Sequence, residues 1–264
     1  MKQNILIIGK NSFLSTNLFK YFKNKKISVT RTSFSLFLEN QEKKLLKYNY
    51  VINCSINNSF LNKKYDSKYD QDLLCAEKLK NVKSKLIIFS TGKVYGPGSS
   101  LKETSKKKPI EKYGKNKLIT EINLFKIKKN LLVFRLSNIV GKENKNNSRK
   151  ITNLFFDDIR KNLKKNFVIV PKKNYYKDFV LIEDFVKIVY LSIIKNLNGT
   201  FNLSTNSKIY LHDLAKDISS FTGAKLKYSN GKTYSFTLNN KKLLNKIKIK
   251  KLKNLRKYFY KFIK

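Results

Sequence analysis

Short apolar runs alternate with helical patterns through the first half of the chain. Runs this continuously apolar are typical of strands buried on both faces of a parallel sheet. Between them, apolar residues recur at helical spacing over 12–23, 70–79 and 113–125, where we expect helices. The alternation predicts an α/β fold with a doubly wound parallel sheet. The expected strands lie at 5–8, 27–29, 50–54, 85–89 and 131–135.

The pattern changes beyond Gly141. A polar segment at 143–148 precedes a helical pattern, an expected strand at 167–170 and mixed elements. We therefore expect two domains: residues 1–145 with the parallel sheet, and residues 146–264 forming mostly a smaller α/β domain.

The final segment, 240–264, combines many lysines with one apolar face. We expect this basic helix to dock on the second domain, because its apolar positions repeat at helical spacing. The alternative is an amphipathic helix that makes a peripheral contact with an anionic membrane. The apolar positions are Leu252, Leu255, Tyr258, Phe259 and Phe262.

The chain is strongly basic, with 58 Lys and Arg against 17 Asp and Glu and a formal net charge of +41. Such a charge favours anionic partners. The basic residues are nevertheless spread along the whole chain together with abundant Asn and Ile, and no RNA-module or zinc signature accompanies them. We therefore interpret the charge as compositional drift and expect no specific nucleic-acid partner.

Several features place the protein in a reducing, aqueous compartment. Cys54 and Cys75 each lie in an apolar run, which is typical of buried thiols and not of a disulfide framework. The N-terminus lacks a signal-peptide pattern, and no apolar run is long enough to cross a bilayer. We expect a cytoplasmic protein.

A tyrosine and a lysine lie four residues apart in one expected helix. Tyr113 and Lys117 therefore share a helix face and can meet at one ligand as a general acid/base pair. We expect the charge of Lys117 to lower the pKa of Tyr113 from its usual value of about 10. By itself this spacing is also typical of a solvated helix face.

The context of the pair is more specific. The strand at 85–89 runs into Ser90 and Thr91, which puts hydroxyls at the carboxyl edge of a parallel sheet, where ligands bind. The order Thr91-Gly-Lys-Val-Tyr-Gly96, Glu103, Pro109 and Tyr113-x-x-x-Lys117 closely resembles the extended short-chain dehydrogenase/reductases. This family comprises nucleotide-sugar epimerases, dehydratases and reductases.

The resemblance continues along nearly the whole chain. The segments 135–141 and 177–184 resemble the family's Arg-x-x-Asn-x-x-Gly and Arg-Asp-Phe-x-x-x-x-Asp segments, with Lys177 in place of the usual Arg, and 199–204 fits the substrate domain. It implies a Rossmann-type sheet with a smaller C-terminal substrate-binding α/β domain, and the family interleaves some later segments into the first domain.

The resemblance also assigns roles to individual residues. Thr91 would hydrogen-bond the substrate oxygen, Tyr113 would donate or accept its proton, and Lys117 would hold the cofactor ribose and tune Tyr113. The alternative role for Thr91 is a strand-end cap. Lys93 and Asn138 are expected on the substrate side.

The cofactor loop departs from the family pattern. Of Gly-x-x-Gly-x-x-Gly only the first glycine remains, because Ser12 and Ser15 replace the other two. Arg31, at the end of the second strand, favours NADP over NAD, although it is also one more cation in a cationic chain. The expected cofactor contacts are Gly9, Ser12, Phe13, Leu14, Arg31, Asn53 and Lys117.

The residues after Thr91 reduce the number of reaction types that the resemblance implies. Gly92 and Lys93 stand where the family's dehydratases have acidic residues, and Lys93 stands where the GDP-fucose synthase-like members have a Cys. We therefore expect an NAD(P)-dependent reductase of a keto-sugar nucleotide, with a nucleotide-sugar 4-epimerase as the alternative. Family analogy further suggests surface-polysaccharide synthesis and a homodimer formed through the helix that contains Tyr113.

Non-enzymatic functions remain open alternatives. The lost glycines fit a catalytically degenerate NAD(P)-binding protein, and the net charge fits an RNA-binding protein on the same fold. We expect no metal site, because no His, Cys and carboxylate cluster has ligand spacing. His212 is expected at the surface or as a helix cap.

Overall fold

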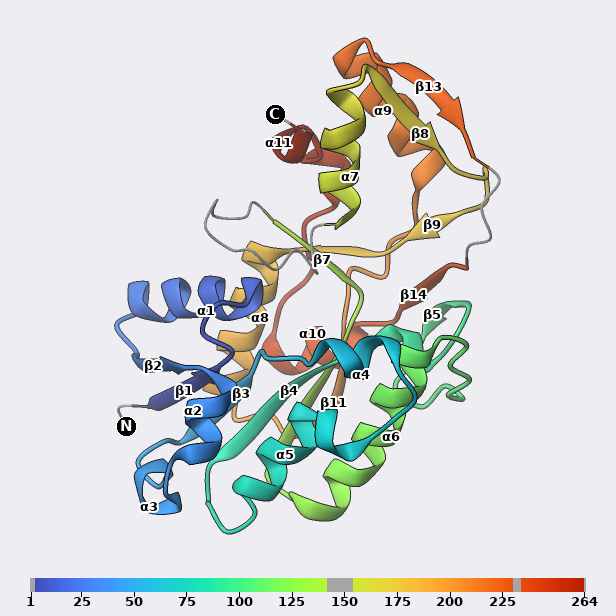
Figure 1. The fold of residues 1–264 in the computed structure, drawn as a ribbon. Helices are drawn as coiled ribbons and strands as arrows, with labels where there is room; N and C mark the ends of the chain where they lie inside the picture. The colour runs from blue at the N-terminus through green and yellow to red at the C-terminus, as the bar shows by residue number, and fades with distance from the viewer. Residues whose placement is uncertain (1–2, 142–153, 230–233, 264) are drawn as a thin grey trace.

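A computed structural model describes residues 3–141, 154–229 and 234–263, and it forms two lobes (Figure 1). The larger lobe contains a six-stranded sheet in the order β11-β6-β4-β3-β1-β2, and every neighbouring pair is parallel. The predicted α/β fold is thereby confirmed. Its strands are β1 (Asn4–Ile8), β2 (Ser28–Thr32), β3 (Tyr50–Asn53), β4 (Lys85–Thr91), β6 (Leu131–Leu136) and β11 (Gly199–Leu203).

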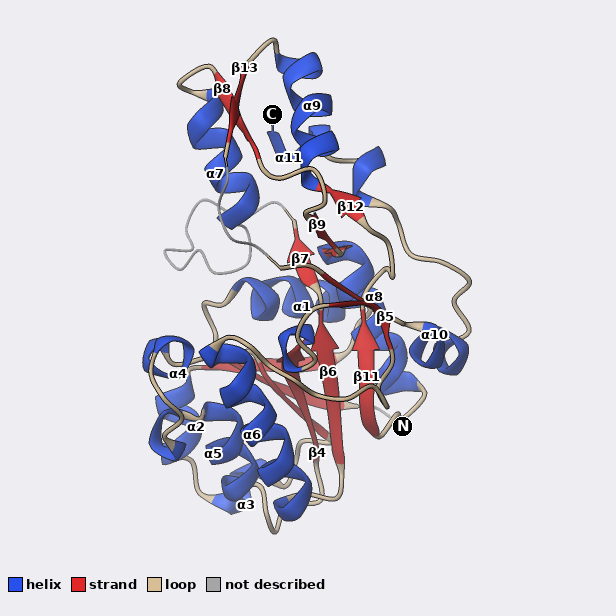
Figure 2. Cartoon of the chain, turned by 90° about the vertical axis from the view of Figure 1, so that its right-hand side faces the viewer, coloured by secondary structure: helices blue, strands red, loops and turns tan. Residues whose placement is uncertain are grey.

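The two faces of the sheet bury alternate residues of each strand, as the period of two in a strand requires. Ile5 and Ile7 of β1 face one core cluster, whereas Leu6 and Ile8 face another. The first cluster includes residues of α1 (Phe13–Asn24), α8 (Ile182–Ile194) and α10 (Lys241–Ile247). The second includes residues of α2 (Phe34–Glu39), α3 (Glu42–Leu45), α5 (Gln71–Lys78) and α6 (Lys112–Ile127), which lie together on one side of the sheet (Figure 2).

The predicted helices form close to the expected positions. Ser12 caps α1 by accepting a hydrogen bond from the Ser15 backbone N–H, and Asp70 caps α5 in the same way through Leu73. These caps explain where the two helices begin, because a side-chain oxygen satisfies a first-turn N–H that has no partner inside the helix.

The smaller lobe has a separate core built mainly from the second half of the chain. The predicted strand at 167–170 is β8 (Phe167–Val170), which pairs in parallel with β13 (Lys225–Tyr228). The two strands lie beside α9, with α7 and α11 also in this lobe (Figure 1). The helices are α7 (Leu154–Leu163), α9 (Leu211–Thr222) and α11 (Tyr260–Ile263).

One segment lies in a different lobe from the one we expected. Residues 199–204 were assigned to the substrate domain, but β11 pairs with β6 at the edge of the main sheet. The chain also returns to the main lobe through α8, which packs against α1. The division near residue 145 stays a prediction, because residues 142–153 lie outside the described part of the chain.

Short elements connect the two lobes. Three short strand pairs join distant segments: β5 with β14, β7 with β10, and β9 with β12. Their bounds are β5 (Gly98–Leu101), β7 (Asn138–Val140), β9 (Tyr176–Lys177), β10 (Phe179–Leu181), β12 (Ile209–Tyr210) and β14 (Phe236–Leu238). The remaining elements are α4 (Asn58–Asn62), η1 (Ser67–Tyr69), η2 (Gly92–Val94) and η3 (Leu255–Lys257).

The basic C-terminal segment docks on both lobes and not, as we expected, on the second domain alone, and it is not one helix. Leu252 is buried in the core of the main lobe, whereas Leu255 and Phe262 are buried in the core of the smaller lobe. Along this segment the chain forms α10, η3 and α11. In the part of the chain that the structure describes, no helix combines the length and apolarity needed to span a membrane.

Candidate active site

The candidate site begins where β1 and β3 end. The chain leaves β1 for β2 on one side and then returns to β3 on the other, so the carboxyl ends of β1 and β3 flank a switch point. Gly9 follows β1 with a φ of +92°, and a Cβ there would lie 2.8 Å from the Ser55 backbone N. Glycine is therefore needed for the two loops to approach each other.

Thr91 ends the neighbouring strand β4 and is buried. Its side-chain oxygen accepts a hydrogen bond from the Lys93 backbone N–H at 3.3 Å, so the strand-end capping role is present. The turn that follows, η2, packs against α6. A Cβ at Gly114 would lie only 2.7 Å from the Lys93 carbonyl oxygen, so this glycine lets the first turn of α6 reach the end of β4.

Tyr113 lies in that first turn and shares an aromatic neighbour with Lys117. The ring of Phe60, from α4, meets the Tyr113 ring edge to face at a centroid distance of 6.5 Å. The Lys117 ammonium lies 5.5 Å from the same Phe60 ring centroid. Asn116 fixes α4 against α6 by donating to the Phe60 carbonyl at 2.8 Å.

Lys117 forms a buried ion pair that the sequence did not suggest. Its Nζ lies 2.5 Å from Asp72 Oδ2 of α5, and each side chain is only 4% exposed. Burial alone would lower the pKa of Lys117, but the Asp72 carboxylate outweighs it and holds this pKa above its usual range. The lysine is therefore charged.

The pKa of Tyr113 moves in the opposite direction to the one we expected. Burial raises it, the charge of Lys117 lowers it in part, and the charge of Asp72 raises it again. The predicted contribution of Lys117 has the correct sign, but the prediction of a lowered Tyr113 pKa is wrong. Burial and Asp72 are properties of the packed site that the Tyr-x-x-x-Lys spacing does not contain.

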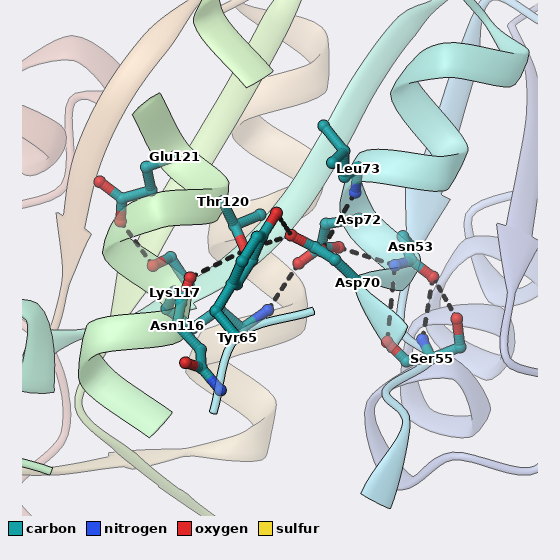
Figure 3. Close-up of polar contacts among 11 residues, drawn as sticks. Asn53, Ser55, Tyr65, Asp70, Asp72, Leu73, Asn116, Lys117, Thr120 and Glu121 are labelled. Carbon is teal, nitrogen blue, oxygen red and sulfur yellow. Dashed lines mark hydrogen bonds and ion pairs between the residues drawn. The ribbon is translucent and has the colours of Figure 1, made fainter. Parts of the chain in front are cut away.

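A hydrogen-bond network continues from Asp72 to the end of β3 and the loop that follows it (Figure 3). Asp72 Oδ1 accepts from Asn53 Nδ2 at 2.7 Å. Asn53 Oδ1 accepts in turn from the Ser55 backbone N–H at 3.0 Å and from the Ser55 hydroxyl at 2.6 Å. Asn53, predicted to contact the cofactor, thus connects the loop after β3, which approaches Gly9, to Lys117 through Asp72.

Asp70 is a second buried carboxylate in this network. Its Oδ2 accepts hydrogen bonds from Thr120 Oγ1 at 2.5 Å and from the Tyr65 hydroxyl at 3.1 Å. Burial raises the pKa of Asp70, and the neighbouring charge of Asp72 adds to the effect. Sequence reasoning missed both carboxylates, although two acids at the start of a buried crossover helix in so basic a chain were an available signal.

The loop before α1 retains the features that a dinucleotide pyrophosphate requires. Within the described residues, the backbone N–H groups of Phe13 and Leu14 have no acceptor, as is usual in a first helical turn, and such groups bind anions. Ser12 serves as the helix cap, and Ser15 fits into the core, where its hydroxyl has no hydrogen-bond partner. The two serines are thus accommodated, and the loop fits the cofactor.

Arg31 contacts this loop from the end of β2. Its Nη1 donates to the Lys10 carbonyl at 3.1 Å and lies 3.4 Å from the Thr16 hydroxyl. The guanidinium also lies 4.3 Å from the Phe19 ring centroid. Arg31 is therefore at the predicted edge of the cofactor loop, but it already helps to hold that loop in place.

The expected substrate-side residues have separate partners. Lys93 Nζ lies 2.5 Å from Glu111 Oε2, in a pair that is 36% and 42% exposed. Asn138 Nδ2 donates to the Asp178 carbonyl at 2.8 Å. Burial lowers the pKa of Lys177, and the charge of Lys93 lowers it further, so these two lysines face a common region.

Asp178 was not singled out as a structural residue. Its carboxylate accepts from the Thr205 backbone N–H at 2.9 Å, from the Thr205 hydroxyl at 2.7 Å and from the Asn206 backbone N–H at 3.0 Å. Burial raises its pKa to about 6, against the effect of these hydrogen bonds. Asp178 thereby joins the loop after β11 to the start of β10.

The remaining titratable residues lie apart from these motifs. His212 is in the first turn of α9, where its ring is largely buried and Nδ1 lies 3.1 Å from Asp213 Oδ1. The expected surface position is therefore wrong. Cys54 and Cys75 are free thiols. Within residues 3–141, 154–229 and 234–263, no group of three or more His, Cys, Asp and Glu side chains could hold a metal ion.

Solved structures with the same fold include enzymes of three reaction types. The NAD-dependent NDP-hexosamine 5,6-dehydratase TunA of tunicamycin biosynthesis has a TM-score of 0.82 at 17% identity, over 99% of this chain and 97% of that one. The UDP-glucose 4-epimerase of Thermotoga maritima, solved with UDP-glucose, has a TM-score of 0.80 at 19% identity, over 99% and 100%. A dTDP-4-dehydrorhamnose reductase from Clostridium acetobutylicum has a TM-score of 0.76 at 20% identity, over 99% and 98%.

At these identities the similarity establishes the fold and does not select a reaction. None of the curated proteins matches the sequence significantly. The family model of the NAD-dependent epimerase/dehydratase family, however, matches residues 5–204, which include Gly9, Thr91, Tyr113 and Lys117. The chain therefore belongs to the NAD-dependent epimerase/dehydratase family.

Proposed function

We propose that this protein is an NAD(P)-dependent oxidoreductase that reduces a keto group on a nucleotide-linked sugar. The observation that carries the proposal is geometric: Tyr113 lies in the first turn of α6, which packs against the turn after Thr91, and the Lys117 ammonium lies beside the same Phe60 ring. Burial also raises the pKa of Tyr113, which supports the proposal. A phenol that stays protonated near neutral pH is suited to give a proton to a carbonyl oxygen. Reduction needs such a donor from the start of the reaction.

Each proposed catalytic residue has one task. The Thr91 hydroxyl hydrogen-bonds the sugar carbonyl oxygen, and Tyr113 donates its proton to that oxygen. When NAD(P)H is bound, its nicotinamide would supply the hydride that, together with this proton, converts the carbonyl to an alcohol. Lys117 hydrogen-bonds the cofactor ribose and keeps a positive charge beside the tyrosine. Lys93 and Asn138 are proposed to face the substrate.

The cofactor contacts are proposed from the geometry of the loop between β1 and α1 and of Arg31 in β2. The N–H groups of Phe13 and Leu14, with the Ser12 hydroxyl, would bind the pyrophosphate close to Gly9. Arg31 favours a 2′-phosphate and hence NADP, whereas its existing contacts with Lys10 and Phe19 favour NAD. TunA, described as NAD-dependent, supports NAD as the alternative.

Cofactor binding is the first test. Titration of NADPH and NADH fluorescence should give saturable binding, and Arg31→Ala should weaken NADPH more than NADH. Equal weakening of both would favour NAD. If neither cofactor binds at millimolar concentration, the enzyme proposal fails, and the catalytically degenerate protein becomes the better description.

Turnover separates the reductase from the 4-epimerase. A reductase consumes one NAD(P)H for each nucleotide-linked 4-keto-hexose, whereas an epimerase interconverts two nucleotide hexoses without net consumption of cofactor. Tyr113→Phe removes the proton donor and should lower kcat by about 10²- to 10⁴-fold. Its cofactor affinity should be unchanged, because the variant keeps Lys117.

We further propose a cytoplasmic homodimer. Ile119, Ile122 and Phe125 form an exposed apolar stripe on α6, at 37%, 52% and 46% exposure. Spacings of three residues place them on one helix face, where a second copy could cover them. Sedimentation should show a dimer that Ile122→Glu dissociates, and a monomeric wild-type protein would contradict this proposal.

A further inference from the structure

The partner of Lys117 has a consequence for the reaction that the catalytic motif does not contain. Asp72 lies 45 residues away in sequence, yet its carboxylate meets the Lys117 ammonium at 2.5 Å. Both side chains are 4% exposed, so little water screens the pair. The charge that Tyr113 experiences therefore comes from the pair and not from the lysine alone.

Asp72 is itself held from two sides. Asn53 at the end of β3 donates to Oδ1 at 2.7 Å, while Lys117 of α6 occupies Oδ2. Asn53 is in turn fixed by two hydrogen bonds from Ser55. Because each carboxylate oxygen has a partner on a different element, Asp72 has one defined position between the end of β3 and helix α6 (Figure 3).

We propose that Asp72 is a positioning residue of the reaction: its carboxylate holds Lys117 in place and offsets the positive charge that Lys117 presents to Tyr113. The role of Tyr113 in this statement rests on the proposed function. The ion pair itself is independent of any substrate. Asp72 thus biases Tyr113 toward the protonated phenol, the form that donates a proton to a carbonyl oxygen.

The other charged and titratable groups around the pair leave this assignment intact. Asp70, from the turn before α5, adds negative charge near Lys117 but lies against Thr120 and Tyr65. Cys54 after β3 is partly buried and Cys75 of α5 is buried. The pKa of each thiol is raised by burial and then by the charge of Asp72, so both are neutral. Phe60, the neighbour from α4, has no charge.

The sign of the expected effect follows from electrostatics. A negative charge near Tyr113 disfavours the phenolate and raises the pKa, and Asp72 acts in this direction. Replacing Asp72 with the nearly isosteric asparagine removes that charge while Lys117 remains. The pKa of Tyr113 should then fall, and the ionisation midpoint should move to lower pH.

Nuclear magnetic resonance of carbon-13-labelled tyrosine tests this without cofactor or substrate. The ring-carbon signal that disappears in Tyr113→Phe is followed from neutral to alkaline pH in the wild type and in Asp72→Asn. We expect a lower midpoint in Asp72→Asn and a midpoint near that of the wild type in Asp72→Glu, which keeps the charge. An unchanged or higher midpoint in Asp72→Asn would overturn the proposal.

Asp70→Asn is the matched control. It removes a charge two residues away in the same network, but no effect of Asp70 on Tyr113 is evident beside those of Lys117 and Asp72. Its midpoint should move less than that of Asp72→Asn. Equal shifts in the two variants would mean that the network acts through general charge, and the specific role of Asp72 would be wrong.

A second pair of variants keeps the test valid if Asp72→Asn does not fold. Lys117→Met is compared with the double variant Asp72→Asn/Lys117→Met, in which neither position of the pair keeps a charge. The double variant should have the lower Tyr113 midpoint, and equal midpoints would overturn the proposal. Once a substrate is known, the alkaline limb of the reductive pH profile should move to lower pH in Asp72→Asn. Because the resonance titration needs no turnover, a failure of this proposal is distinguishable from a failure of the proposed enzyme activity.

Discussion

Helix α6 contributes one residue to each of two buried ion pairs, one turn apart. The cations of the two pairs differ in how many hydrogen bonds they donate within the protein. Lys117 pairs with Asp72, and Glu121 pairs with Arg135 at 2.6 Å between Nη2 and Oε2. All four side chains are at most 7% exposed. Burial and charge are thus nearly matched, so the comparison isolates the number of hydrogen bonds that each cation makes.

Arg135 uses its donors within the protein. Its Nε lies 3.1 Å from both Glu121 oxygens, and its Nη1 donates to the Tyr95 hydroxyl at 2.7 Å and lies 3.3 Å from the Glu103 carbonyl. Lys117 has three donors, and within the described residues Asp72 is its one hydrogen-bond acceptor. Donors without an acceptor in the described residues are available to a ligand. We therefore interpret the Glu121–Arg135 pair as structural and propose that the Lys117–Asp72 pair belongs to the candidate site.

The largest expected effect on stability comes from breaking the Glu121–Arg135 pair. Glu121→Ala leaves the Arg135 guanidinium buried without its carboxylate and also removes the acceptor of the Ser90 hydroxyl. We expect a loss of about 3–5 kcal/mol in the free energy of unfolding, measured by urea denaturation. A loss below about 1 kcal/mol would mean that the pair is not structural.

A smaller loss is expected when only the outer partner of Arg135 is removed. Tyr95→Phe deletes a hydroxyl that accepts from Arg135 and donates to Asn202 Oδ1 at 2.9 Å, while the aromatic ring stays in the core. The expected loss is about 1–3 kcal/mol by the same denaturation measurement. No change in stability would show that Arg135 is satisfied by Glu121 alone.

The smallest effect is expected at a third ion pair, which is made by Glu111, the residue that precedes this helix. Glu111→Ala breaks the Lys93–Glu111 pair, which is 36% and 42% exposed and therefore screened by solvent. The expected change in unfolding free energy is about 0–1 kcal/mol, and added salt should reduce it. Because Glu111 and Glu121 are the same residue type, one at the N-cap and one in the body of α6, Glu111→Ala is the matched control for Glu121→Ala, and equal losses would contradict the comparison.

Much of the site could be predicted because it is local in sequence. Tyr113 and Lys117 lie four residues apart in a helix, and Thr91 ends a strand whose apolar run is evident, so their elements follow from short-range periodicity. Asp72 could not be paired with Lys117 in this way. Its partner is 45 residues away, and the contact depends on how α5 packs beside α6.

The amino-acid sequence by itself determined the first five strands of the sheet, the helices α1, α5 and α6 and the order of the candidate catalytic residues, because apolar periodicity and local motifs act over a few residues. Only the tertiary structure placed β11 at the edge of the main sheet and divided the basic C-terminal segment between two cores. It also decided the direction of the Tyr113 pKa. Burial and charge at that hydroxyl come from elements that meet only when the whole chain is folded.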